Sequence, residues 1–130
     1  LPSLAESEIR VLEYDACGGR EHFISAVAGD SLIGFARLRF PSSVFREELE
    51  GASLLRELHV YGSLVPVGLT ADEAEWQHRS FGRELIARAE EIARAGGYRG
   101  LAIMSGIGVR PYYRKLGYER RGPYMRRDLA

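Results

Sequence analysis

The stretch that decides the fold runs from Glu73 to Gly97 and reads EAEWQHRSFGRELIARAEEIARAGG. From the spacing of its apolar residues we expect a helix over about Phe81–Ala95, ended by the glycine pair that closes the stretch. Glu90 and Arg94 then form an i,i+4 pair on the solvent side. The residues expected to face the core are Phe81, Leu85, Ile86, Ala89, Ile92 and Ala93.

The start of this helix carries the wrong charge for a helix N-terminus. Residues 77–83 read QHRSFGR and place Arg79 and Arg83 where the helix dipole favours acids. Extra cations at the positive end of a helix predict a bound anion such as a phosphate, although an arginine-rich helix start without a ligand reads the same way.

The charge distribution points in the same direction without deciding the matter. The net charge is zero, but residues 1–76 hold six arginines against thirteen acids, a balance of −7, whereas residues 77–130 have a balance of +7. Either a C-terminal half that faces phosphates or a mosaic surface explains this polarity.

The bulk composition favours one soluble globular domain of 130 residues, with 45% hydrophobic and 28% charged residues. Cys17 is the only cysteine, which excludes an internal disulfide and predicts a reducing, cytoplasmic location. Cys17, His22 and His78 lack the paired spacing of metal ligands, so we expect no metal site. No apolar run predicts a membrane span, and the missing initiator Met predicts a piece of a longer protein.

Strand patterns surround the helix and predict an α/β sheet. Alternation in the strand before the helix places Leu58 and Val60 on one face and Glu57, His59 and Tyr61 on the other. Strands are expected at Ile9–Tyr14, Phe23–Ala28, Leu32–Phe40, Leu54–Tyr61 and Leu101–Ser105, with a short helix at Val109–Leu116 and a final strand or hairpin over Tyr118–Leu129.

Three kinds of glycine-containing phosphate turn can be compared with the chain. A P-loop motif is absent, and GIGVRP (106–111) departs from a dinucleotide fingerprint because Pro111 replaces the third glycine. QHRSFG (77–82) resembles the Q/R-x-x-G-x-G/A signature of the GNAT acetyltransferases, and YYRKLGY (112–118) resembles their F-Y-x-K-x-G-F segment. With GFARLRFP, RELHVYGSLVPVG and RGPYM, the chain from Ile9 onward is similar to the acetyltransferase domain of the Elongator catalytic subunits.

The resemblance implies an α/β GNAT acetyltransferase fold with a mixed, mostly antiparallel sheet flanked by helices. The segment between the first two strands is too short for the usual pair of helices, so we expect the acceptor-side helices to be reduced. Residues 1–130 would form a single GNAT-like domain. In the family this domain follows a radical-SAM domain, which carries an iron–sulfur cluster and S-adenosylmethionine and which the single cysteine excludes here.

The family's reaction uses acetyl-CoA to modify C5 of the wobble uridine in tRNA, so the implied partners are acetyl-CoA, tRNA and the radical-SAM domain. Two other functions stay open. One is a free-standing N-acetyltransferase acting on protein lysine or a small amine, and the other is a non-catalytic module that binds CoA.

The resemblance also assigns site residues. Acetyl-CoA would be bound by the strand residues Glu57, Leu58, His59 and Val60 and by Gln77, Phe81, Gly82 and Arg83 at the helix start. Tyr113 would lie near the sulfur and protonate the departing thiolate, with core packing as its alternative role. Glu57 or His59 could act as a base, Tyr112 is assigned to core packing, and Ser80 departs from the glycine usual in the family.

Overall fold

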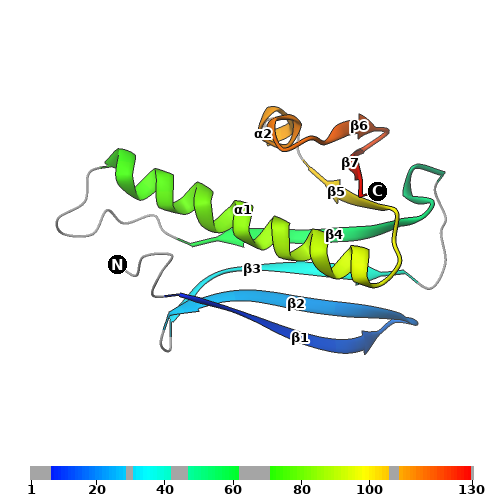
Figure 1. Ribbon diagram of the computed structural model, residues 1–130, viewed down its shortest axis with the longest axis horizontal. Helices are drawn as coiled ribbons and strands as arrows, with labels where there is room; N and C mark the ends of the chain where they lie inside the picture. The colour runs from blue at the N-terminus through cyan, green and yellow to red at the C-terminus, as the bar shows by residue number, and fades with distance from the viewer. Residues whose placement is uncertain (1–6, 29–30, 42–46, 62–70, 106–108, 130) are drawn as a thin grey trace.

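A single sheet, ordered β1-β2-β3-β4-β5-β7-β6, organises the molecule (Figure 1). The computed structural model describes residues 7–28, 31–41, 47–61, 71–105 and 109–129, with residues 71–78 as helix backbone only. Its strands are β1 (Glu8–Ala16), β2 (Gly19–Ala28), β3 (Ser31–Phe40), β4 (Ala52–Val60), β5 (Gly100–Met104), β6 (Glu119–Arg121) and β7 (Tyr124–Asp128). Its helices are the 3-10 turn η2 (Glu47–Leu49), α1 (Ala71–Ala95) and α2 (Arg110–Lys115).

The strand pairing confirms the predicted fold class. Strands β1 to β4 pair antiparallel in chain order, β4 and β5 pair in parallel, and β5, β7 and β6 are again antiparallel. Cys17 (φ 50°) and Gly18 (φ 77°) alone join β1 to β2, with the positive φ angles that tight hairpins favour. No helix separates these two strands, which confirms the reduced acceptor side.

The helix α1 crosses one face of the sheet and builds the main core (Figure 1). Side chains alternate between the two faces along each strand, and directly opposed partners share a face. Ile24, its partner Ala36, and Leu38 therefore point toward α1. The predicted helix core is confirmed, with Ile92 only partly buried. The buried helix residues are Phe81, Leu85, Ile86, Ala89 and Ala93.

Two expectations about this helix are wrong. It begins at Ala71 and not near Phe81, because residues 71–76 (ADEAEW) are mostly strong helix formers with acids near the N-terminal end. Glu90 is not an exposed partner of Arg94: it is 7% exposed, and Arg94 donates instead to the Leu129 carbonyl. Glu90 lies four residues after Ile86 and three before Ala93, so helical spacing places it on the core side.

The other predicted elements are confirmed with small shifts in their ends. The short helix α2 carries Pro111 in its first turn and is followed by Gly117 at φ 96°, and β6 and β7 form the final hairpin. Gly29-Asp30, between β2 and β3, and most of the segment between β4 and α1 lie outside the described residues. Among the described residues, no helix has the length and apolar character needed to cross a membrane.

Gly34 tests how closely β3 and β4 must approach. A Cβ atom at this position would lie 2.7 Å from the His59 carbonyl oxygen, which is backbone and cannot rotate away. We expect Gly34→Ala to lower the free energy of unfolding by about 1–3 kcal/mol through overpacking. Urea unfolding measures this change, with Gly82→Ala as the matched control because a Cβ atom there has room. Equal stability of wild type and Gly34→Ala would contradict the prediction.

Candidate functional site

A bulge in β4 opens the sheet at its centre. Arg37 pairs with Glu57 and Leu38 pairs with Leu55, so Arg56 is an extra residue on β4. Pairing with β5 covers only Ala52 to Leu55, while β4 continues to Val60. Beyond β5 the chain turns away into α2, and Figure 1 shows β4 running on past the end of β5. The result is a wedge between the two parallel strands.

Three adjoining pockets follow this wedge. The cation pocket, about 220 Å³, is lined by Arg79, Ser80, Arg83, Tyr112, Lys115 and Leu116. The apolar pocket, about 230 Å³, is lined by Leu58, Val60, Arg79, Gly82, Val109, Tyr112 and Tyr113. The third, the strand pocket of about 380 Å³, includes Phe35, Arg56, Glu57, His59 and Ser105 and shares Leu58, Val109 and Tyr113 with the apolar pocket. Shared walls make the three pockets one continuous cleft.

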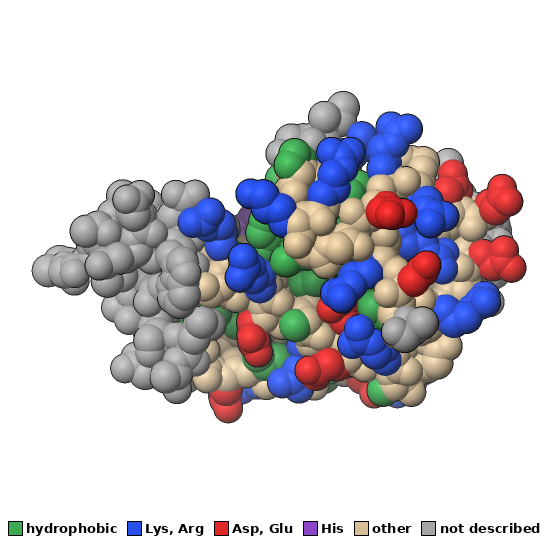
Figure 2. Space-filling view, turned by 45° about the horizontal axis from the view of Figure 1, so that its top comes forward, with side chains coloured by type: hydrophobic (Ala, Val, Ile, Leu, Met, Phe, Trp, Pro, Cys, Tyr) green, Lys and Arg blue, Asp and Glu red, His purple; other side chains and the backbone are tan. Residues whose placement is uncertain are grey.

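The cation pocket is built by α1 and α2 together. Arg79 and Arg83 are four residues apart on α1 and therefore share a helix face, and Lys115 comes from α2. Its described lining contains three cations and no carboxylate. Figure 2 turns the α2 side of the molecule toward the viewer and shows Lys and Arg side chains gathered there. This pocket has the charge to bind an anion.

The early start of α1 changes how that anion would be held. Residues 77–83 lie inside the helix, where each backbone N–H group bonds to the carbonyl four residues earlier. The expected cradle of free N–H groups at a helix N-terminus is therefore not formed by these residues. The groups that this pocket offers to an anion are side chains: Arg79 and Arg83 on α1 and Lys115 on α2.

Gly82 borders the apolar pocket from within α1. A Cβ atom there would lie 3.4 Å from the Tyr112 hydroxyl and 3.9 Å from Val60 Cγ2, in ordinary contact. Glycine costs a helix about 1 kcal/mol relative to alanine. Glycine at this position is therefore not needed to avoid a clash, and its effect is to leave more space between α1 and Tyr112.

Tyr113 lies where the apolar pocket meets the strand pocket. Its side chain is 7% exposed and packs edge-on against Tyr112 and Tyr118. Burial, with a smaller contribution from Tyr112, raises the pKa of Tyr113 above its usual range. The phenol therefore keeps its proton at neutral pH and can donate it.

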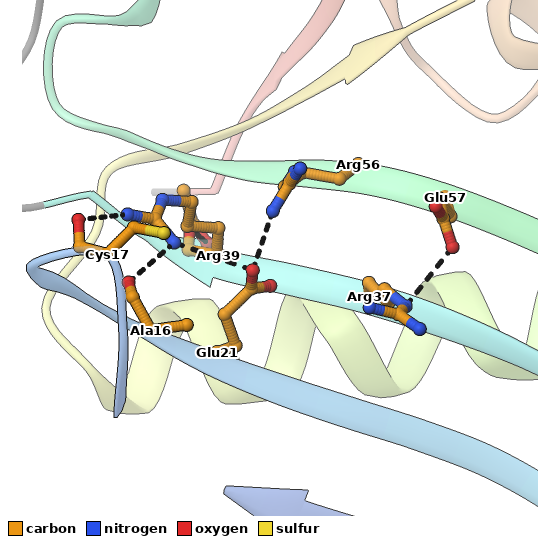
Figure 3. Close-up of polar contacts among 8 residues, drawn as sticks. Ala16, Cys17, Glu21, Arg37, Arg39, Arg56 and Glu57 are labelled. Atoms are coloured by element: carbon orange, nitrogen blue, oxygen red, sulfur yellow. Dashed lines mark hydrogen bonds and ion pairs between the residues drawn. The ribbon is translucent and has the colours of Figure 1, made fainter. Parts of the chain in front are cut away.

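The two candidate bases on β4 have different surroundings. Glu57 is held in an ion pair with Arg37, with Arg37 Nε 3.1 Å from Glu57 Oε2 (Figure 3). His59 stacks on Phe35 at 5.9 Å between ring centroids and lies 4.6 Å from the Tyr61 ring. The guanidinium of Arg37 offsets the charge of Glu57, whereas these contacts of the His59 imidazole are with aromatic rings.

The bulge residue Arg56 is held by polar contacts that reach β2, β3 and the β1–β2 connection. Arg56 Nη1 donates to Glu21 Oε1 at 2.6 Å, and this carboxylate is buried (Figure 3). Arg39 contacts the same oxygen at 3.4 Å and donates to the carbonyls of Ala16 and Cys17 in the β1–β2 turn. The position of the bulge therefore depends on a polar chain that crosses three strands.

The predicted site residues fall into three groups. Leu58, Val60, Gly82 and Tyr113 meet in the apolar pocket, Arg83 lines the cation pocket, and Glu57 and His59 line the strand pocket. The Phe81 side chain lies in the core instead, and the side chain of Gln77 lies outside the described residues.

Sequence reasoning named Arg79 as a cation at the helix start without assigning it to the cofactor, and it did not assign Tyr112 or Lys115 to the site. Tyr112 packs against the core, as predicted, and it also lines two pockets. Burial raises the pKa of Tyr112, while Arg83 and Arg79 oppose that shift. The signal was the spacing itself, because Arg79 and Arg83 share a helix face and Tyr112 and Lys115 are three residues apart on α2.

Comparison of the chain with known families defines the class of protein to which this cleft belongs. The family described as Acetyltransferase (GNAT) matches residues 2–118. The chain belongs to the GNAT acetyltransferase family, whose members use acetyl-CoA as the acetyl donor. A putative GNAT acetyltransferase from Desulfovibrio desulfuricans shares the fold alone, with a TM-score of 0.64 and 23% identity over 89% of this chain and 73% of that chain.

Within the family, the predicted resemblance to the Elongator catalytic subunits is confirmed. The chain is 44% identical to the tRNA uridine(34) acetyltransferase of Methanocaldococcus jannaschii, over 99% of this chain and 25% of that protein. It is 51% identical to Elongator complex protein 3 of Danio rerio, over 90% of this chain and 22% of that protein. The structure of archaeal Elp3 from Methanocaldococcus infernus superposes with a TM-score of 0.83 and 42% identity, over 98% of this chain and 31% of that chain. The chain thus spans about a quarter of the length of the curated relatives it matches.

Gly82→Ala separates the helix from the pocket. We expect the free energy of unfolding to rise by about 0.5–1 kcal/mol, because alanine favours the helix and its Cβ atom has room. Affinity for acetyl-CoA should change little, because the added Cβ atom makes only ordinary contacts and the family signature admits alanine at this position. Urea unfolding and calorimetric titration measure the two effects. A large loss of affinity, or a loss of stability, would contradict the prediction.

Proposed function

We propose that the chain is the acetyl-CoA-binding domain of an Elongator-type enzyme that modifies C5 of the wobble uridine in tRNA. Residues 1–130 form a single GNAT-like domain, and in the full-length protein this domain contacts a radical-SAM domain with its iron–sulfur cluster and S-adenosylmethionine. The observation that carries the proposal is the order of the cleft: cations, then apolar walls, then a buried phenol beside an aromatic strand face.

The chemistry of the cleft fits the parts of acetyl-CoA in their covalent order. Arg79, Arg83 and Lys115 supply charge for the phosphates, and arginine is well suited to bidentate phosphate contacts. The apolar pocket fits the pantetheine arm, and the diverging edge of β4 offers backbone groups to its amides. We assign these contacts to Leu58 and Val60 on the strand and to Gly82 on the helix.

Acetyl-CoA supplies the activated acetyl group and a thiolate as leaving group. Tyr113 holds a proton at its hydroxyl at the junction of two pockets, and it donates this proton to the thiolate. The walls of the apolar pocket keep water from the bond that breaks. No residue in the strand pocket needs to act as a strong base if the acceptor is activated elsewhere.

The strand pocket favours a flat aromatic acceptor over an ammonium group. Glu57 is the one carboxylate among the described residues of its lining and is already paired with Arg37, so these residues offer no unpaired anion to a lysine. Phe35, His59 and Tyr61 form a cluster of rings on the face of β3 and β4. Rings of this kind stack on nucleobases. This supports the tRNA uridine over the alternative of a free-standing lysine acetyltransferase.

Removal of one cation tests the cofactor assignment. We expect Arg83→Ala to weaken acetyl-CoA binding roughly tenfold, because it removes a charge-assisted contact to phosphate. Binding of the wild type should weaken with added salt, because the contact is electrostatic. Calorimetric titration measures both, with Arg114→Ala as the control: Arg114 is an exposed cation on α2 that lines none of the three pockets. No detectable binding by the wild type at millimolar acetyl-CoA would reject the proposal.

Tyr113→Phe tests the proton donor. The substitution keeps the aromatic ring and removes the hydroxyl that donates the proton. Folding should therefore survive, while the rate of thiol release from acetyl-CoA should fall roughly a hundredfold. A general acid must be protonated, and burial raises the pKa of Tyr113, so wild-type release should stay level from pH 7 to pH 9.

The same assay, run with tRNA, with a histone peptide and with neither, identifies the acceptor. We expect the chain alone to release thiol slowly by hydrolysis, in which water takes the acetyl group to give acetate, and to acetylate peptides only marginally. Robust, saturable acetylation of a lysine peptide would instead establish the free-standing acetyltransferase. Unchanged thiol release by Tyr113→Phe would remove Tyr113 from the mechanism and leave the binding assignment intact.

A further inference from the structure

A buried polar cluster lies behind Tyr113, on the side away from the cleft. The Tyr118 hydroxyl donates to Glu90 Oε2 at 2.7 Å, and Arg127 Nη1 donates to both oxygens of Glu90 at 3.0 and 3.2 Å. Tyr118 is 1% exposed and Glu90 is 7% exposed. The three residues come from the start of the final hairpin, from α1 and from β7, so the cluster joins three elements. None of the three lines a pocket of the cleft.

The polar groups of this cluster would destabilise the fold if they were buried without partners, and here they satisfy one another. A buried hydroxyl or carboxylate destabilises the fold unless it is hydrogen-bonded, and here the hydroxyl has an acceptor and the carboxylate has a guanidinium. Burial and the hydrogen bond to Glu90 raise the pKa of Tyr118 far above its usual range, so the hydroxyl is a permanent donor. Phenylalanine would fill the same volume without the polar groups, so the hydroxyl fixes a position rather than filling space.

Tyr118 is coupled to Tyr113 in two ways. Its backbone N–H donates to the Tyr113 carbonyl at 3.1 Å, where the N–H of Leu116 also donates at 3.0 Å. The two rings meet edge to face, with centroids 6.1 Å apart and an interplanar angle of 62°. Helix α2 has only six residues and is too short to be stable by itself, so its place depends on such tertiary contacts.

We infer that Tyr118, held by Glu90 and Arg127, is a positioning residue that sets the Tyr113 hydroxyl in the cleft. The inference rests on the proposed function, because it gives Tyr113 a proton to deliver. Tyr118 acts only through Tyr113 and touches neither acetyl-CoA nor the acceptor. The cluster links α1 and β7, which both contribute to the main core, to Tyr118, which follows the short helix α2.

A double-mutant cycle tests the inference by thiol release from acetyl-CoA. Tyr118→Phe should lower kcat roughly ten- to a hundredfold, the cost of misplacing a reacting group by about 1 Å. KM and the affinity for acetyl-CoA should not change, because Tyr118 lines no pocket. In the Tyr113→Phe background the same substitution should have no further effect, because no proton donor remains to be placed. Glu90→Gln, which removes the charge that holds both partners, should repeat this pattern.

The matched control is Tyr98→Phe, which removes a hydroxyl from a partly buried tyrosine that packs against Phe40 and lines none of the three pockets. Its kcat should equal that of the wild type. Unchanged kcat in Tyr118→Phe, an equal loss in both backgrounds, or no effect of Tyr113→Phe itself would each overturn the inference. Failure of the wild type to bind acetyl-CoA is a separate result, because it rejects the proposed function before the cycle begins.

Discussion

The structure depends on the point at which β4 parts from β5. Parallel pairing holds the two strands together as far as Leu55, and the extra residue Arg56 then bends β4 while it remains paired with β3. A β-bulge increases local twist and redirects a strand without ending its pairing. The wedge that results gives the molecule a cleft in the middle of a continuous sheet, and each part of the candidate site lies along it.

The ion pair between Arg56 and the buried Glu21 is compatible only with the observed position of Arg56 on this face, and it therefore favours the observed register (Figure 3). Slippage by one residue would turn each side chain of β4 to the other face. Leu58 and Val60 would leave the apolar face, and Glu57 and His59 would enter it. Arg56 is held toward Glu21, Arg39 contacts the same carboxylate, and Glu57 is paired with Arg37, so opposite charges mark the correct register across β2, β3 and β4.

The opposite wall of the cleft is fixed in a different way. Helix α2 is short, and its one buried residue, Tyr113, is also the candidate proton donor. Contacts with Tyr112, Leu116 and Tyr118 therefore decide where that donor lies. The strand wall is set by register and the helix wall by side-chain anchoring, so the two walls respond to different kinds of substitution.

The sequence by itself determined the elements, the fold family and most residues of the candidate site. Helical spacing predicted the core face of α1, alternation predicted the two faces of β4, and the short motifs named Gly82, Arg83 and Tyr113, which line adjoining pockets in the structure. These features depend on local periodicity and on residue types at fixed spacing, which one chain displays directly. The length of α1, the burial of Glu90, the part played by Tyr112 and the pairing of Glu57 with Arg37 were decided only by the tertiary structure. Each of these features depends on which residues, distant in sequence, lie close in space. The sequence does not show whether a given carboxylate or phenol is in contact with water or with a buried partner.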